Sequence, residues 1–166
     1  MTFTDFLAGQ AVFLDANTLV YHFQPHPLFG PACNQLVARI EQGELQGFTS
    51  THILTEVAHR LMMIEASTLP GWGPASVKRR LQQQPSAIQN LKQFPKAIES
   101  VLNSNIQILT IAPSLVLAAA AISQASGLLS NDAMIVALMQ SNGLTSLASH
   151  DADFDRVSGI IRYAPA

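Results

Sequence analysis

The sequence has little charge and almost no cysteine. Charged residues make up 12% of the 166 residues, which is about half the share in an average protein. Hydrophobic residues make up 48% of the chain, and the mean hydropathy is +0.24. So apolar a chain can bury enough surface to fold, which excludes intrinsic disorder. The single cysteine, Cys33, excludes a disulfide framework and favours a reducing compartment such as the cytoplasm.

Long hydrophobic runs are also missing. The longest run without a polar residue in the middle of the chain extends from Leu115 to Ile122, far short of the roughly 20 residues that span a bilayer. The first five residues lack the basic region of a signal peptide. We therefore expect a cytoplasmic protein with no membrane partner, folded as a single domain over residues 1–166.

The sequence also lacks an excess of positive charge. The chain has nine Lys and Arg against eleven Asp and Glu, which gives a formal net charge of -2. This balance argues against a protein that is held to nucleic acid by bulk positive charge. The positions of the few charged residues are therefore more informative than their sum.

Strand and helix patterns alternate along the chain. Short apolar runs predict strands at 11–14, 45–49, 106–111, 144–148 and 160–163. Helical spacing, caps and breakers predict helices from Asn17 or Thr18 onward, and at 33–41, 51–67, 76–84, 87–103 with a break at Pro95, 114–126 and 132–141. A loop marked by Pro25 and Pro27 separates the first two helices, and Ser130 or Asn131 is expected to cap the last one.

This alternation predicts a three-layer α/β/α sandwich with a central parallel sheet of about four to five strands. Residues 70–104 form a helical elaboration of it. Four acids fall at positions that face one edge of such a sheet, where strands end and helices begin: Asp15, Glu56, Asp132 and Asp151. Each one alone has a structural explanation, such as a helix cap or a helix-dipole partner. Together they repel one another, and hard cations such as Mg²⁺ or Mn²⁺ relieve that repulsion.

The segments around these acids resemble the PIN-domain nucleases, the family that includes the VapC toxins. The resemblance covers residues 11–157 and lies in four segments that occur in the family's order. These are Val12-Phe-Leu-Asp15-Ala-Asn17, Thr51-His-Ile-Leu-Thr-Glu56, Leu128-Leu-Ser-Asn-Asp132 and Ser149-His-Asp151-Ala-Asp153. The chain departs from compact members by about ten extra residues before the first strand and by longer segments around 25–31 and 70–94.

The resemblance implies a metal-dependent endoribonuclease and is compatible with a role as the toxin of a toxin–antitoxin pair. Its Mg²⁺ or Mn²⁺ would be held by Asp15, Glu56, Asp132 and Asp151, with Asp153 as the reserve for the fourth position and Asn17 and Ser149 supporting the ligands. It also implies an RNA substrate, a small antitoxin partner and a homodimer. The alternative is a non-catalytic PIN-like domain that binds RNA or protein. A haloacid dehalogenase-type phosphohydrolase is disfavoured because position 17 is Asn rather than Asp.

Three further features invite interpretation. His52 and His59 flank Glu56 on one helix, but the HExxH pattern of zinc proteases is absent. Lys78-Arg79-Arg80 is either a solvated helix face or a contact for RNA phosphates. Trp72 either packs against the core or stacks on a base. Without the four acids at the sheet edge the rest of the chain carries +2, and residues 66–131 carry +4, which predicts modest, salt-sensitive RNA affinity.

Overall fold

The computed structural model of the protein describes residues 1–24 and 26–166. Pro25, one of the residues that predicted a loop, lies outside this range. Five strands are present: β1 (Ala11–Leu14), β2 (Gln46–Ser50), β3 (Gln107–Leu109), β4 (Ser146–Ala148) and β5 (Ile161–Tyr163). The helices are α1 (Ala16–Phe23), α2 (Gly30–Glu41), α3 (Thr51–Ser67), α4 (Val77–Gln83), α5 (Pro85–Asn90), α6 (Gln93–Leu102), α7 (Pro113–Ser126) and α8 (Ser130–Ser141), with short 3-10 turns η1 (Phe3–Asp5) and η2 (Ala152–Arg156).

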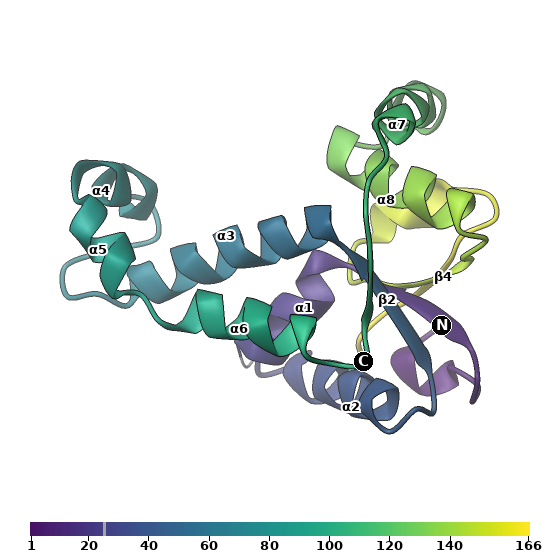
Figure 1. The fold of residues 1–166 in the computed structure, drawn as a ribbon, viewed down its shortest axis with the longest axis horizontal. Helices are drawn as coiled ribbons and strands as arrows, with labels where there is room; N and C mark the ends of the chain where they lie inside the picture. The colour runs from purple at the N-terminus through teal and green to yellow at the C-terminus, as the bar shows by residue number, and fades with distance from the viewer. Residues whose placement is uncertain (25) are drawn as a thin grey trace.

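The five strands form one parallel sheet in the order β3-β2-β1-β4-β5. The connections from β1 to β2 and from β2 to β3 run toward one edge, whereas the connection from β3 to β4 returns past β1. Because parallel crossovers are right-handed, helices α1 to α6 and helices α7 and α8 belong to opposite faces of the sheet (Figure 1). The predicted α/β sandwich with a parallel sheet is confirmed.

The reversal of strand order places a switch point between β1 and β4. Phe13 pairs with Leu147 and Leu14 with Ala148, so these two central strands end level with each other. Ligands of parallel α/β sheets bind beyond the carboxyl ends of the strands at such a point. Asp15 follows β1 directly, and Ser149 follows β4 directly.

Apolar strands and helix faces fill the space on both sides of the sheet. Val12, Phe13 and Leu14 are completely buried in β1, and Leu147 and Ala148 are buried beside them. The extra residues before β1 belong to this core, since Phe3 and Phe6 are buried and Phe6 stacks on Tyr163 of β5.

Three predicted helix ends are wrong. Asp15, rather than Asn17 or Thr18, is the N-cap of α1, and its side chain accepts a hydrogen bond from the Ala16 amide. Leu129 precedes α8, which has no side-chain cap, so neither Ser130 nor Asn131 caps it. Pro95 lies in the first turn of α6 instead of breaking the helix, because proline is tolerated where the helix has no amide to pair.

A second, smaller apolar cluster lies at the far end of α3 (Figure 1). Its buried members are Ala66, Val77, Leu81 and Leu91. We call residues 69–92, which contain α4 and α5, the lobe. Because the lobe packs around its own cluster at the end of one long helix, it contributes nothing to the burial of the sheet.

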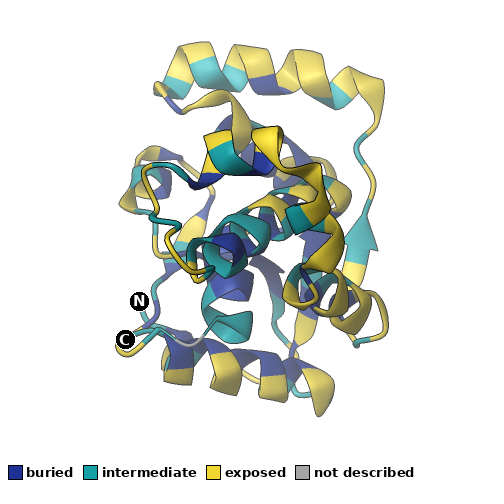
Figure 2. Ribbon diagram, turned by 90° about the vertical axis from the view of Figure 1, so that its left-hand side faces the viewer, coloured by how far each residue is buried: buried dark blue, intermediate teal, exposed yellow. Residues whose placement is uncertain are grey.

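Helix α7 lies against α8 and is largely exposed (Figure 2). Ala119 is its only buried residue, whereas Val116 and Leu117 are 57% and 79% exposed. Over residues 1–24 and 26–166 no single helix has the length and apolar character needed to cross a membrane, although α7 and α8, bent by 114°, pass that test as a pair.

Candidate active site

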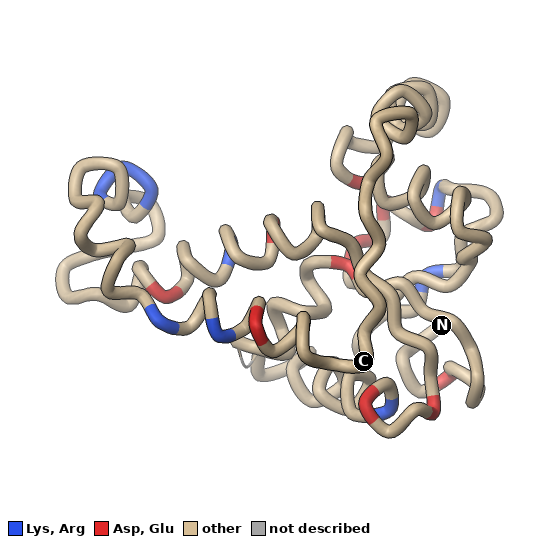
Figure 3. Tube along the Cα trace, viewed as in Figure 1, with Lys and Arg blue, Asp and Glu red and all other residues tan. Residues whose placement is uncertain are grey.

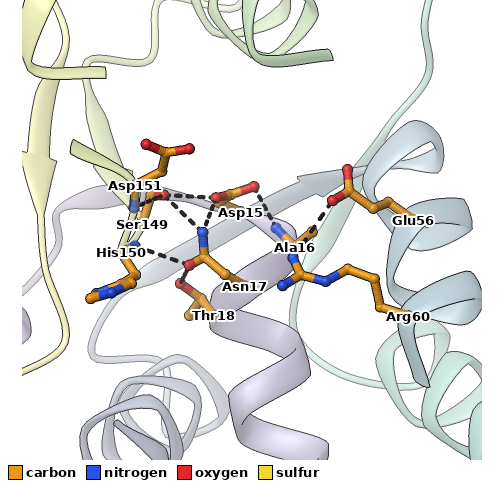
Figure 4. A network of polar contacts seen from close by, with 9 residues as sticks. All are labelled: Asp15, Ala16, Asn17, Thr18, Glu56, Arg60, Ser149, His150 and Asp151. Carbon is orange, nitrogen blue, oxygen red and sulfur yellow. Dashed lines mark hydrogen bonds and ion pairs between the residues drawn. The ribbon is translucent and has the colours of Figure 1, made fainter. Parts of the chain in front are cut away.

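Asp15 lies at the centre of a hydrogen-bonded network beyond the ends of β1 and β4 (Figure 4). Its carboxyl group accepts a hydrogen bond from the Ala16 amide at 2.6 Å through Oδ1. Its Oδ2 atom accepts hydrogen bonds from the Ser149 hydroxyl at 2.7 Å and from the Asn17 amide group. A carboxylate offers about four acceptor positions. Three are therefore filled by the protein, and the remaining one is on Oδ1.

The Ser149 hydroxyl uses all of its hydrogen-bonding positions, and its bonds join the ends of β1 and β4. While donating to Asp15, its hydroxyl oxygen accepts from Asn17 Nδ2 at 3.1 Å and from the Asp151 amide at 3.0 Å. Asn17 Oδ1 accepts from the His150 amide at 3.0 Å, which fixes which end of the Asn17 side chain is the amide nitrogen. Asp15, Asn17 and Ser149 are all at least nine-tenths buried, so this part of the site is rigid before any ligand arrives.

Threonine hydroxyls satisfy the backbone carbonyls at the same sheet edge. Thr18 donates to the Ala148 carbonyl at 2.8 Å, and Thr49 donates to the Leu14 carbonyl at 3.0 Å. Both threonines are completely buried. The Thr18 bond ties the first turn of α1 to the end of β4, and the Thr49 bond ties β2 to the end of β1. Nothing in the sequence signals these bonds beyond the presence of the hydroxyls.

Two of the other three predicted acids, Glu56 and Asp132, lie near enough to Asp15 for their charges to act on it, and the charge of Asp151 acts on Asp132. Burial raises the pKa of Asp15 to about 6 against the hydrogen bonds from Ser149 and Ala16, and the charges of Glu56 and Asp132 raise it further. Burial also raises the pKa of Asp132 to about 6, and the charges of Asp151, Glu56 and Asp153 add to this effect. The structure therefore brings the predicted acids to one place, where their charges disfavour one another.

We call Asp15, Glu56, Asp132 and Asp151 the acid cluster. Glu56 lies near the start of α3 and forms an ion pair of 3.6 Å with Arg60, one helical turn later. Asp151 is the N-cap of η2, where its Oδ1 accepts from the Asp153 amide at 2.9 Å. Asp153 is half exposed and forms an ion pair with Arg156. Neither Arg60 nor Arg156 was singled out from the sequence as a partner of these acids. Their spacings of four and three residues are nevertheless those of ordinary helical ion pairs.

Within the described ranges, no three His, Cys, Asp or Glu side chains are close enough to form a ready-made metal site. His52 and His59, the two histidines weighed above as zinc ligands, also belong to no such group of described residues. The chemistry of the donors nevertheless fits a hard divalent cation. The acid cluster consists of oxygen ligands, its charges repel one another although Arg60 and Arg162 offset part of that repulsion, and one acceptor position on Asp15 is unfilled.

Comparison with known proteins identifies the family of this chain. A family model described as PIN domain matches residues 12–160. The chain belongs to the PIN-domain family. The match begins in β1 just before Asp15 and includes the whole acid cluster. A comparison with curated proteins found no significant match.

Solved structures share the PIN fold at low sequence identity. VapBC2 from Rickettsia felis, solved with a DNA fragment from its promoter, is 16% identical with a TM-score of 0.53, covering 93% of this chain and 98% of that one. A toxin–antitoxin complex from Klebsiella pneumoniae is 18% identical with a TM-score of 0.52, covering 90% and 95%. A protein of Pyrobaculum aerophilum is 14% identical with a TM-score of 0.54, covering 93% and 91%. At these identities the likeness shows the fold.

Proposed function

We propose that the protein is a metal-dependent endoribonuclease that hydrolyses RNA phosphodiesters at the acid cluster. The observation that carries this proposal is the position of Asp15, a buried carboxylate held by Asn17 and Ser149 at the switch point of a PIN-fold sheet. The charges of Glu56 and Asp132 act on this carboxylate without a bond to it. Carboxylates that repel one another in this way are typical of sites that bind a cation, because the cation offsets their repulsion.

Asp15, Glu56, Asp132 and Asp151 would hold Mg²⁺ or Mn²⁺. When bound, such ions supply Lewis-acid stabilisation of the charge that develops on the phosphodiester and lower the pKa of water. The chain's own part is positioning. Ser149 and Asn17 occupy Oδ2 of Asp15 and so direct its Oδ1 atom to the cation. Arg60 forms an ion pair with Glu56 and so orients it from the same helix.

Asp151 rather than Asp153 is proposed as the fourth ligand. The Asp151 backbone is bound to the same Ser149 hydroxyl that holds Asp15. Asp153 is engaged with Arg156 and lies further outside. Asp153 then acts from outside the ligand shell, through its charge on Asp132.

The biological setting that we propose is that of a toxin with an antitoxin partner in the cytoplasm. It is supported by the likeness of the fold to the Rickettsia and Klebsiella toxin–antitoxin proteins. A homodimer is supported by the exposed side of α7, where Val116 and Leu117 face solvent, since exposed apolar surface of this kind marks protein contacts. Residues 1–166 would form one domain, with residues 70–104 as its helical elaboration.

A cleavage assay tests the catalytic proposal. The purified chain is expected to cut a labelled RNA into 5′ and 3′ fragments in Mn²⁺ or Mg²⁺, to lose this activity in EDTA, and to regain it when the ion is restored. Calorimetry with Mn²⁺ separates this proposal from the non-catalytic alternative. The wild type should bind the ion and Asp15→Asn should not, whereas a non-catalytic RNA-binding domain would bind RNA without Mn²⁺ uptake at this site.

A further inference from the structure

We infer that the lobe is an anchoring surface for single-stranded RNA, several nucleotides away from the phosphodiester at the acid cluster. This inference deepens the proposed ribonuclease function and rests on it for the identity of the ligand. The lobe is not needed to complete the sheet, since it packs around its own small cluster of Ala66, Val77, Leu81 and Leu91. It is therefore free to serve a purpose other than the stability of the catalytic core.

The ion pairs divide the basic residues of the chain into two groups. The four arginines outside the segment 78–96 are each paired with a carboxylate: Arg39 with Glu44, Arg60 with Glu56, Arg156 with Asp153 and Arg162 with Asp155. The five basic residues inside that segment form no ion pair with any described residue: Lys78, Arg79, Arg80, Lys92 and Lys96. We call these five the basic set. Among the described residues, every Lys and Arg without an ion pair thus lies in or beside the lobe.

Few acids lie near this charge. Between residues 66 and 98 the sequence contains no Asp or Glu. The flanking acids are Glu65, which is partly exposed and whose carboxylate accepts hydrogen bonds from the Lys92 amide at 2.7 Å and the Gln93 amide at 2.9 Å, and the exposed Glu99 on α6. Figure 3 shows blue segments on α4 and at the start of α6 near one end of α3, with one red segment at that end of α3, one further along α6, and others near the opposite end of α3. An anionic ligand of extended shape is the partner that fits this arrangement.

An aromatic side chain accompanies the charge. The Arg80 guanidinium lies 5.8 Å from the centre of the Trp72 ring. Trp72 is only partly buried, and it lines a pocket of about 470 Å³ whose other lining residues include Glu65, Gln84 and Asn90. Proteins that bind single strands combine basic residues along the phosphates with an aromatic ring on which a base stacks. The lobe has both parts within a few residues, which favours a single strand over a duplex whose bases are already stacked.

Helix α3 sets the distance between the lobe and the acid cluster. Glu56 and Ser67 are eleven residues apart on this helix, which corresponds to about 16 Å at 1.5 Å per residue. A stacked strand advances about 3.4 Å per nucleotide, so about five nucleotides separate the two regions. RNAs shorter than this cannot reach both of them, so the contribution of the lobe should depend on substrate length.

The test compares a lobe variant with a control variant of equal charge change. Lys78→Gln/Arg79→Gln removes two exposed positive charges from α4, and Gln35→Glu/Gln42→Glu adds two negative charges at exposed positions of α2 and its C-cap. Binding of a fluorescein-labelled 12-nucleotide single-stranded RNA is measured by anisotropy in EDTA at several salt concentrations. The lobe variant should raise Kd by about tenfold and reduce the slope of log Kd against log salt by about 1.4, whereas the control should change Kd by less than about twofold.

Two further measurements examine length and stacking. In Mn²⁺ the lobe variant should raise KM for the 12-nucleotide RNA about tenfold with kcat unchanged, and should leave both constants unchanged for a 3-nucleotide RNA. Trp72→Leu, which keeps an apolar side chain in the small cluster, should raise Kd by about fivefold, and Trp72→Phe should raise it less.

The outcomes separate this inference from the proposed function. Lobe-dependent RNA binding without cleavage in any metal would overturn the nuclease function and leave the anchoring surface standing. Cleavage in which both double variants raise KM equally would overturn the anchoring surface and leave the nuclease standing. Equal binding of a 12-base-pair duplex, with the same loss in the lobe variant, would show a general polyanion surface and so contradict the assignment to a single strand.

Discussion

Helix α3 connects two regions that are constructed in opposite ways. At its first turns Glu56 belongs to the acid cluster, where buried threonines at the strand ends and a saturated serine hydroxyl hold Asp15 in place. At its last turns the helix carries the lobe, which has a small core of its own and an exposed basic surface. The first region gains its properties from burial, and the second gains them from solvent exposure. Substitutions should therefore have large effects on chemistry in the first region and graded effects on binding in the second.

The largest contrast is expected from Asp15→Asn. Removal of this charge should lower kcat/KM for RNA cleavage in Mn²⁺ by at least about a thousandfold, which is about 4 kcal/mol of transition-state stabilisation. The fold should remain, because asparagine can still cap α1. Asp5→Asn, at the surface turn η1, is the matched control and should leave cleavage unchanged. A cleaving Asp15→Asn enzyme with a native circular dichroism spectrum would refute the assignment of the site.

The pH dependence of stability should separate the regions next, because raised acid pKa values occur only at the acid cluster within the described chain. A native pKa of about 6 against an ordinary value of 3.8 means that folded Asp15 binds its proton more tightly than unfolded Asp15. The free energy of unfolding of the metal-free protein should therefore fall as pH rises from about 4 to about 6, by about 3 kcal/mol from Asp15.

Urea unfolding at pH 4.5 to 7.5 in EDTA measures this loss. Asp15→Asn should flatten most of the dependence, and Mn²⁺ should restore stability at pH 7, where the carboxylates are ionised. A wild-type protein whose metal-free stability rose across the same range would contradict the direction of the Asp15 and Asp132 pKa shifts.

Ser149→Ala should give an intermediate effect. It removes one donor from Asp15 and leaves the buried Asp151 amide without its acceptor. Mn²⁺ affinity measured by calorimetry should fall by about 10- to 100-fold, and the unfolding free energy should fall by about 1–3 kcal/mol. Ser146→Ala on the same strand removes a buried hydroxyl that bonds Gln10 instead. That control should lose stability and keep its metal affinity, and equal loss of affinity in both variants would exclude a specific role for Ser149.

The smallest effect is expected where the two regions join. Glu65→Gln weakens the two hydrogen bonds that tie the end of α3 to the start of α6. Amides of the lobe should exchange about fivefold faster, equivalent to about 1 kcal/mol of local stability, while amides of β1 and β4 remain unaffected. Glu99→Gln, on the exposed side of α6, serves as the control. Faster exchange throughout the sheet would mean that the lobe and the catalytic core unfold together.

The sequence predicted the sheet edge better than the helix ends, and the reason is physical. Short apolar strands followed by acids fix both the fold class and the position of Asp15 and Asp151, because strand period and chain direction leave few alternatives. The hydrogen bonds that select among those acids were not predictable. Ser149 and Asp15 are 134 residues apart, and the engagement of Asp153 by Arg156 depends on the geometry of a single turn. The division of basic residues into paired and unpaired groups likewise required the folded chain.

The long separation between Asp15 and Ser149 also has a consequence for synthesis of the protein. A ribosome adds about 5–20 residues per second, so the 134 positions that separate the two side chains correspond to about 7–27 s of translation. Glu56 and then Asp132 are added during this time, but the chain still lacks the hydroxyl that holds Asp15, and the strand β4 that precedes it is made only at the end. The hydrogen-bonded network around Asp15 therefore cannot form until residue 149 of the 166 has been added.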